Sequence, residues 1–104
     1  MAEDRPDIGD ETGSGVQQEV DEPPLYKVLL LNDDYTTMEF VVEILRHVFH
    51  KTNEEAVTVM LNVHRKGMGV CGIYPYEVAE TKVDTVHSLA RESSFPLKCV
   101  MEKE

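Results

Sequence analysis

Two helix-start signals that lie close together constrain the fold of this chain more than any other feature of its sequence. Each is a threonine followed three residues later by a glutamate, Thr36 with Glu39 and Thr52 with Glu55. In such a capping box the hydroxyl and the carboxylate satisfy backbone N–H groups that the start of a helix leaves without partners. We therefore expect one helix to begin at Thr36 and a second at Thr52, joined by a link so short that they must fold back on each other.

The apolar residues behind each signal recur at helical spacing. The first helix should run to about His50. The second should end near Gly67, because glycine readily adopts the left-handed conformation that closes a helix. The expected apolar stripes are Met38, Val41, Val42, Leu45, Val48 and Phe49 in the first helix, and Ala56, Val57, Met60, Leu61, Val63 and His64 in the second.

Short apolar segments on either side of this helix pair predict strands over residues 25–31, 70–73 and 97–101. Between the last two, Pro75 suits the first turn of a third helix, where its missing N–H costs no hydrogen bond. The order β-α-α-β-α-β predicts an α+β fold. We expect a two-layer sandwich in which three helices cover one face of a three-stranded antiparallel sheet.

Charge divides the chain into two regions. Residues 1–22 hold eight acidic residues and one basic residue, a net charge of −7 out of −10 for the whole chain, and no aromatic residue. Such a segment buries too little apolar surface to offset the entropy lost on ordering, so we expect a disordered acidic extension. Residues 23–104 should form one small domain, too small for a large catalytic cleft.

Composition also excludes several functions. An acidic chain whose only adjacent basic pair is Arg65-Lys66 is not expected to bind a nucleic acid backbone. No apolar run is long enough to span a membrane and no secretion signal begins the chain, so we expect a cytoplasmic protein that contacts no membrane. Cys71 and Cys99 lie far apart and within apolar segments, which predicts free, half-buried thiols rather than a disulfide.

Three motif-like features of the sequence do not fit the phosphate-binding, calcium and metal sites that they suggest. Residues 67–72 match GxGxxG, but they end a helix and enter a strand, which is the reverse of a phosphate-binding loop. Neither Asp33 nor Asp34 is followed by the glycine and glutamate that a calcium loop requires at its sixth and twelfth positions. His47 and His50 lack a third ligand at metal spacing, so no metal or cofactor is expected.

The most informative polar residues lie where the first strand should give way to the first helix. Asn32, Asp33 and Asp34 form a polar turn there, and His64 shares a helical face with Met60. Two ordinary interpretations stay open, a solvated turn beside a helix dipole and a core histidine with a local partner. Together, however, a carboxylate, an amide oxygen and an imidazole suit an ammonium group, which has three donors and no acceptor. Four side chains could line an apolar pocket beside them, Met38, Val41, Met60 and Val63.

Several segments resemble one known family in both residues and spacing. They are Tyr26-Lys27-Val28, Leu31-Asn32-Asp33-Asp34-Tyr35-Thr36, Met38-Glu39-Phe40-Val41, Met60-Leu61-Asn62-Val63-His64, Val70-Cys71-Gly72, Glu77-Val78-Ala79-Glu80-Thr81-Lys82-Val83 and Pro96-Leu97. The family is ClpS, the adaptors that serve Clp proteases in the bacterial N-degron pathway, and the resemblance covers about residues 25–103. Two positions depart from it. Thr37 stands where many relatives carry proline, and Pro75 is uncommon at its position.

The resemblance implies a non-enzymatic adaptor that binds proteins by a bulky first residue, Leu, Phe, Tyr or Trp. In this family the substrate's α-amino group is held by residues that match Asn32, Asp33 or Asp34, and His64. The first side chain enters a pocket that matches Leu30, Leu31, Thr36, Met38, Val41, Met60, Val63 and Leu97. The partner is the N-terminal domain of the ClpA unfoldase, or of a ClpC-type relative, contacted through positions that match Glu77 and Lys82.

Three alternatives to the adaptor remain. ClpS-like domains of eukaryotic N-recognin ubiquitin ligases lie within very long chains, so the length of this chain disfavours them. A ribosomal-stalk-like interaction domain shares the order of elements but needs no amine-binding group, so Asn32, Asp34 and His64 discriminate against it. An enzyme is the remotest alternative, since the sequence offers neither a recognisable nucleophile nor a metal set.

Overall fold

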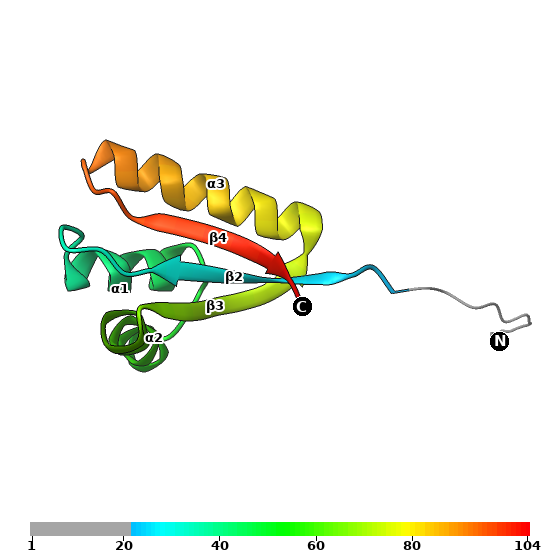
Figure 1. The fold of residues 1–104 in the computed structure, drawn as a ribbon, viewed down its shortest axis with the longest axis horizontal. Coiled ribbons are helices and arrows are strands. Elements are labelled where there is room, and N and C mark those ends of the chain that lie inside the picture. The colour runs from blue at the N-terminus through cyan, green and yellow to red at the C-terminus, as the bar shows by residue number, and fades with distance from the viewer. Residues whose placement is uncertain (1–21) are drawn as a thin grey trace, which may run out of the picture.

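The computed structural model describes residues 22–104, which form one sheet and three helices (Figure 1). In chain order the elements are β2 (Leu25–Leu31), α1 (Met38–His47), α2 (Asn53–Lys66), β3 (Met68–Pro75), α3 (Tyr76–Glu92) and β4 (Lys98–Lys103). The predicted order β-α-α-β-α-β is confirmed, although β3 extends further in both directions than expected and β4 begins and ends later. The disorder expected for the acidic extension concerns residues outside the described range, apart from Glu22, and stays a prediction.

The three strands form an antiparallel sheet in the order β3-β2-β4. The most apolar segment, β2, is the central strand, and its Leu30 pairs with Gly69 of β3 on one side and Cys99 of β4 on the other. The register with β3 shifts between Val28 and Leu29. A nearly continuous apolar strand suits this central place, because both neighbouring strands and one layer of helices cover it.

The hydrophobic core lies between the helices and one face of the sheet. Val28 and Leu30 of β2 are completely buried there. The helices contribute Val41, Ile44, Leu45, Ala56, Val63, Ala79, Val86 and Ala90 to the same core. The predicted two-layer α+β sandwich is therefore confirmed. On the other face, Leu29 pairs with Val70 and Val100, whose side chains are 43% and 40% exposed.

Helix α1 begins one residue later than the capping-box prediction requires. Its N-cap is Thr37, whose hydroxyl accepts a hydrogen bond from the Phe40 N–H at 3.1 Å, and the first helical residue is Met38. The expected N-cap, Thr36, instead donates its hydroxyl proton to the carboxylate of Asp33 at 2.7 Å. The prediction of a capping box at Thr36 is therefore wrong, because this side chain belongs to the preceding turn.

The C-terminal end of α1 is also earlier than predicted, at His47 rather than near His50. Just beyond it, the carbonyl of Val48 accepts a hydrogen bond from the ammonium group of Lys82 in α3 at 2.7 Å. This ammonium group also lies over two aromatic rings. A cation at a helix C-terminus is favoured by the helix dipole, so Lys82 ties α3 to the link between α1 and α2.

Helix α2 begins with the capping box that the sequence predicts. The Thr52 hydroxyl accepts a hydrogen bond from the Glu55 N–H at 3.1 Å, and the Glu55 carboxylate accepts one from the Thr52 N–H at 2.9 Å. The helix closes on Gly67, which has a φ of 91°. Glycine is favoured at this position because side chains rarely tolerate the left-handed conformation, which confirms the helix-end interpretation of the glycine-rich segment.

A second glycine, Gly69 in β3, allows α2 to pack closely against the sheet. A Cβ atom at this position would lie 2.8 Å from Cγ2 of Val63 and 3.1 Å from the carbonyl oxygen of Val59. Val63 precedes His64 in the last turns of α2. The close approach at Gly69 therefore sets where this end of the helix lies relative to the sheet.

Helix α3 connects the edge strands β3 and β4. Pro75 was expected in its first turn, but it is the last residue of β3 and the N-cap of α3, which begins at Tyr76. Near the other end, Nε2 of His87 accepts a hydrogen bond from the Cys99 N–H at 3.0 Å, linking the helix to β4.

Cys71 and Cys99 are free, as predicted, and buried rather than half-buried. Burial raises the pKa of Cys99 to about 12, so this thiol stays protonated near neutral pH.

We expect Gly69→Ala to lower the free energy of unfolding by about 1–3 kcal/mol, because the added methyl overlaps a packed side chain. Val63→Ala removes the atom that this methyl would meet. The double variant should therefore lose less stability than the two single variants together. Urea denaturation of the four proteins measures these values. Strictly additive losses would mean that this contact does not set the position of α2.

Candidate functional site

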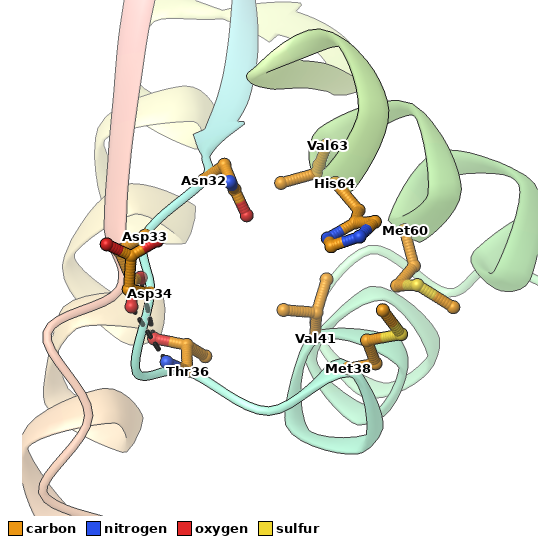
Figure 2. Close-up of a pocket in the computed structure, with 9 residues that line it drawn as sticks. All are labelled: Asn32, Asp33, Asp34, Thr36, Met38, Val41, Met60, Val63 and His64. Carbon is orange, nitrogen blue, oxygen red and sulfur yellow. Dashed lines mark hydrogen bonds between the residues drawn. The ribbon is translucent and has the colours of Figure 1, made fainter.

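A cavity of about 220 Å³ opens between the turn at residues 32–34 and the helices α1 and α2 (Figure 2). Its walls come from three segments, namely the loop between β2 and α1, the first turns of α1 and the C-terminal half of α2. The lining residues are Asn32, Asp33, Asp34, Thr36, Met38, Val41, Met60, Val63 and His64. Polar groups stand on the turn and near the end of α2, and apolar side chains lie between them (Figure 2).

The carboxylate of Asp33 holds the turn together. Its Oδ1 accepts hydrogen bonds from the backbone N–H groups of Tyr35 (2.8 Å) and Thr36 (2.7 Å), and its Oδ2 accepts one from the Thr36 hydroxyl (2.7 Å). Partial burial raises the pKa of Asp33, but the hydrogen bonds from Thr36 and Tyr35 outweigh it, and the pKa lies below its ordinary value. A carboxylate has about four acceptor sites, so three internal bonds leave room for one more donor.

A backbone hydrogen bond connects this turn to the end of α2. The N–H of Asn32 donates to the carbonyl oxygen of Gly67 at 2.9 Å. The two segments that carry the polar groups of the cavity are therefore joined directly, although they are distant in sequence. The side-chain amide of Asn32 points into the opening, toward the helix that bears His64 (Figure 2).

His64 lies across the cavity from the turn, in the last turn of α2 (Figure 2). Its side chain is exposed, so the interpretation as a core histidine is wrong. Within residues 22–104 neither the His64 ring nor the Asp34 carboxylate takes part in a side-chain hydrogen bond. The Asp34 carboxylate and the acceptor nitrogen of a neutral His64 ring are therefore both available to a ligand in the cavity.

The apolar part of the cavity combines rigid and deformable side chains. Val41 and Val63 are 6% and 3% exposed and belong to the hydrophobic core. Met38 is 46% exposed and Met60 is half-buried, so both stand nearer the solvent. Because methionine has three rotatable bonds and a polarisable sulfur, these two side chains can adapt to ligands of different shape. Met38 is therefore not the ordinary core residue that the spacing of apolar residues alone suggests.

Three residues matched to the pocket by family resemblance do not line the cavity. Leu30 and Leu97 are 0% and 4% exposed and lie within the hydrophobic core. Leu31 borders a different depression on the other side of the turn. In an alternating strand that is buried on the helix side, Leu30 faces the core and Leu31 the opposite side. Strand alternation was therefore the signal in the sequence that could have separated Leu31 from the pocket.

The two positions matched to partner contacts lie on α3 and do not border the cavity. Glu77 is exposed in the first turn of the helix, whereas Lys82 is half-buried and its ammonium group donates to the carbonyl of Val48.

Among residues 22–104 there is no group of three or more histidine, cysteine, aspartate or glutamate side chains that could hold a metal ion. In the same range no helix combines the length and apolarity needed to cross a membrane.

The geometry suits one kind of ligand. A side-chain amide, two carboxylates and an imidazole line one part of the cavity, and the side chains of Met38, Val41, Met60 and Val63 line the other part. Such a site complements a molecule that carries an ammonium group next to an apolar side chain. Fold and cavity together define a small α+β domain with a candidate ligand-binding cavity.

Comparison with known proteins identifies the family. The model of the family described as ATP-dependent Clp protease adaptor protein ClpS matches residues 21–100. The chain is similar to the ATP-dependent Clp protease adapter protein ClpS of Desulforapulum autotrophicum, with 58% identity over 104 residues that cover 100% of both chains. It is also similar to the protein of the same name from Desulfatibacillum aliphaticivorans, with 56% identity over 98 residues that cover 94% of this chain and 93% of the relative.

A solved structure agrees with this assignment. The chain is similar to the structure of Agrobacterium tumefaciens ClpS2 bound to L-phenylalaninamide, with a TM-score of 0.77 and 42% identity, covering 80% of this chain and 100% of that chain. The chain therefore belongs to the ClpS family of ATP-dependent Clp protease adaptors. The family resemblance seen in the sequence is confirmed.

We expect Thr36→Val to weaken the turn by about 1 kcal/mol, because it removes the hydroxyl that donates to Asp33 and keeps the shape of the side chain. Thr36→Ser keeps the hydroxyl and is the matched control. The depressed pKa of Asp33 contributes stability above its unfolded-state pKa, and this contribution is lost as the pH falls through the folded-state pKa. The difference in free energy of unfolding between the two variants should therefore be smaller in acid than at neutral pH. Urea denaturation under both conditions measures this difference. An equal difference in acid and at neutral pH would contradict the assigned hydrogen bond.

Proposed function

We propose that this ClpS-family chain is a non-enzymatic adaptor that binds the free amino terminus of proteins beginning with Leu, Phe, Tyr or Trp and delivers them to the ClpA unfoldase, or a ClpC-type relative, in the cytoplasm. The observation that carries the proposal is the division of one cavity into a polar rim and an apolar interior. At an amino terminus, an ammonium group and a side chain are attached to the same carbon atom. The two parts of the cavity complement these two groups.

In this proposal the ammonium group binds at the polar rim. Its three donors meet the side-chain oxygen of Asn32, a carboxylate from Asp33 or Asp34, and the neutral imidazole of His64. Each donor left unpaired in a partly desolvated site costs on the order of 1–3 kcal/mol. A residue inside a chain has a neutral N–H, and its chain continues where the rim closes the site, so internal residues are rejected.

The first side chain enters the apolar interior between Val41, Val63 and the two methionines. A cavity of about 150 Å³ lined by apolar side chains accommodates benzene. The volume of about 220 Å³ is therefore sufficient for a phenyl or isobutyl group. Burial of a Leu or Phe side chain contributes roughly 2–3 kcal/mol. Neither this contribution nor the amine contacts suffice alone, so binding requires a free amine and a large apolar side chain together.

The bound ligand named for the Agrobacterium relative supports this proposal. L-Phenylalaninamide carries a free α-amino group and a phenyl side chain, and its carboxyl group is closed as an amide, as in a peptide chain. It therefore has the two groups that the cavity of the present chain complements.

We assign the contact with the unfoldase to α3, through Glu77 and the accessible part of Lys82. Glu77 is exposed on a helix that packs against the sheet and does not border the cavity, so a partner bound there leaves the cavity open to substrate. The ammonium group of Lys82 is bonded to Val48. Lys82 therefore contributes to this surface through its aliphatic stem and by holding α3 in place.

Fluorescence anisotropy with labelled peptides that differ only in their first residue tests the proposed function. Peptides beginning with Leu, Phe, Tyr or Trp should bind, and acetylation of the amino group should abolish binding because it removes the charge and two of three donors. An acetylated Leu peptide that binds as well as the free one would contradict the adaptor proposal. A chain that binds none of these peptides would instead behave as the ribosomal-stalk-like interaction domain.

The proposal also predicts that affinity depends on pH through His64. Protonation turns its only acceptor into a donor and places a positive charge beside the ammonium group. Affinity for a Phe peptide should therefore fall as acid protonates the ring. Protonation of the peptide amine alone would have the opposite effect. His64→Gln keeps an acceptor that does not titrate, so its affinity should not fall, and a fall equal to that of the unmodified chain would exclude His64 from the site.

Met38 should control which first residues are accepted. It stands at the mouth of the cavity, where a substrate side chain branched at the β-carbon places an extra methyl group, and such crowding costs roughly 1–3 kcal/mol. Met38→Ala should admit Ile and Val peptides and weaken binding of Leu, because wall contacts disappear. The Leu-to-Ile affinity ratio and the melting temperature are measured together. A lower melting temperature with an unchanged ratio would show that Met38 has only a packing function.

A further inference from the structure

A second depression lies on the other side of the turn at residues 32–34. Its volume is about 360 Å³, and it is lined by residues 31–35 together with Pro96 and Lys98. Because residues 32–34 also line the candidate cavity, the turn forms a ridge between the two depressions. The segment that leads into β4 runs along this side of the turn, away from α2 (Figure 2). We call this depression the ridge groove.

We propose that the ridge groove is a second subsite of the same binding site, which takes the side chain of the substrate's second residue and favours an aliphatic or aromatic one. This inference rests on the proposed function. In an extended peptide, successive side chains point to opposite sides of the backbone. If the first side chain lies in the cavity on one side of the ridge, the second therefore points toward the groove on the other side.

The polar groups along the ridge favour this path for the substrate backbone. Asn32 lines both depressions, and its amide has two donors and an acceptor, so it can bind both the C=O and the N–H of a peptide chain that crosses the ridge. A third depression adjoins the cavity beside Met38 and Met60, but its polar side chains are Glu39 and Glu43, which only accept hydrogen bonds. A backbone that leaves on that side would find no side-chain donor for its carbonyl groups.

The lining of the ridge groove indicates the chemistry of its occupant. Tyr35, 76% exposed, is the most exposed of the large apolar side chains in the described range, and it lines the ridge groove together with Leu31 and Pro96. A tyrosine ring has a large apolar surface, and it contributes to binding free energy when an apolar group of the ligand covers that surface. The charged groups are one ammonium, from Lys98, against the carboxylates of Asp33 and Asp34. The net negative charge of the groove lining disfavours an acidic second residue.

The test uses three peptides that share a first Leu and differ at the second residue, which is Phe, Ser or Asp. Anisotropy with the full chain should give about threefold to tenfold tighter binding for Phe than for Ser, and the weakest binding for Asp. Tyr35→Ala keeps the backbone N–H that donates to Asp33, so it should bring the Phe-to-Ser ratio close to one and leave the Ser affinity unchanged. Tyr76→Ala, at an exposed tyrosine of α3 outside the groove, is the matched control and should keep the ratio.

Two outcomes would overturn the inference and leave the proposed function intact. One is equal affinity for the Phe and Ser peptides while acetylation of the amine still abolishes binding. The other is an equal loss of affinity for all three peptides in the Tyr35→Ala variant. That result would mean that Tyr35 stabilises the turn and does not form a subsite. If instead no peptide with a first Leu depends on its free amine, the proposed function itself fails. The acetylated peptides therefore separate the two failures.

Discussion

The carboxylate of Asp33 accepts three hydrogen bonds from its own turn, and the arrangement of the polar groups around the cavity depends on them. They close the chain between β2 and α1 into a short ridge that carries Asn32 and Asp34. The backbone bond from Asn32 to Gly67 then connects this ridge to the end of α2. A ligand that needs acceptors from both segments meets them already in place, so little binding free energy is spent on ordering them.

The rest of the fold serves this geometry through a few close contacts. The central strand anchors the turn at one end, because its alternate residues are buried under the helices. The absence of a side chain at Gly69 lets α2 lie close to β3, and the left-handed conformation of Gly67 turns the chain directly from that helix into the sheet. Lys82 holds α3 against the link between α1 and α2. The surface that we assign to the unfoldase and the cavity that we assign to the substrate are thus parts of one packed core.

The sequence predicts the order of elements and the polar residues of the cavity, but not which neighbour each side chain chooses. Thr52 and Thr36 both begin a threonine–glutamate pair, yet only Thr52 forms a capping box. Asp33, three residues before Thr36, offers the Thr36 hydroxyl a competing acceptor, and Thr37 is free to cap the helix instead. Likewise, resemblance to the family groups Leu30, Leu31 and Leu97 with the pocket, whereas the alternation of the strand and the depth of the core place them elsewhere. Local patterns identify an element, and tertiary contacts decide the partners at its ends.

In the proposed function, one cavity binds an ammonium group and an apolar side chain at the same time. Amide chemical shifts of the ¹⁵N-labelled chain, followed by NMR during titration with leucinamide and separately with N-acetylleucinamide, test it most directly. We predict saturable shift changes concentrated in residues 32–38 and 60–64 with leucinamide, and no comparable changes with the acetylated compound. Equal responses to both compounds, or changes centred on Val70 and Val100 on the exposed face of the sheet, would contradict the account.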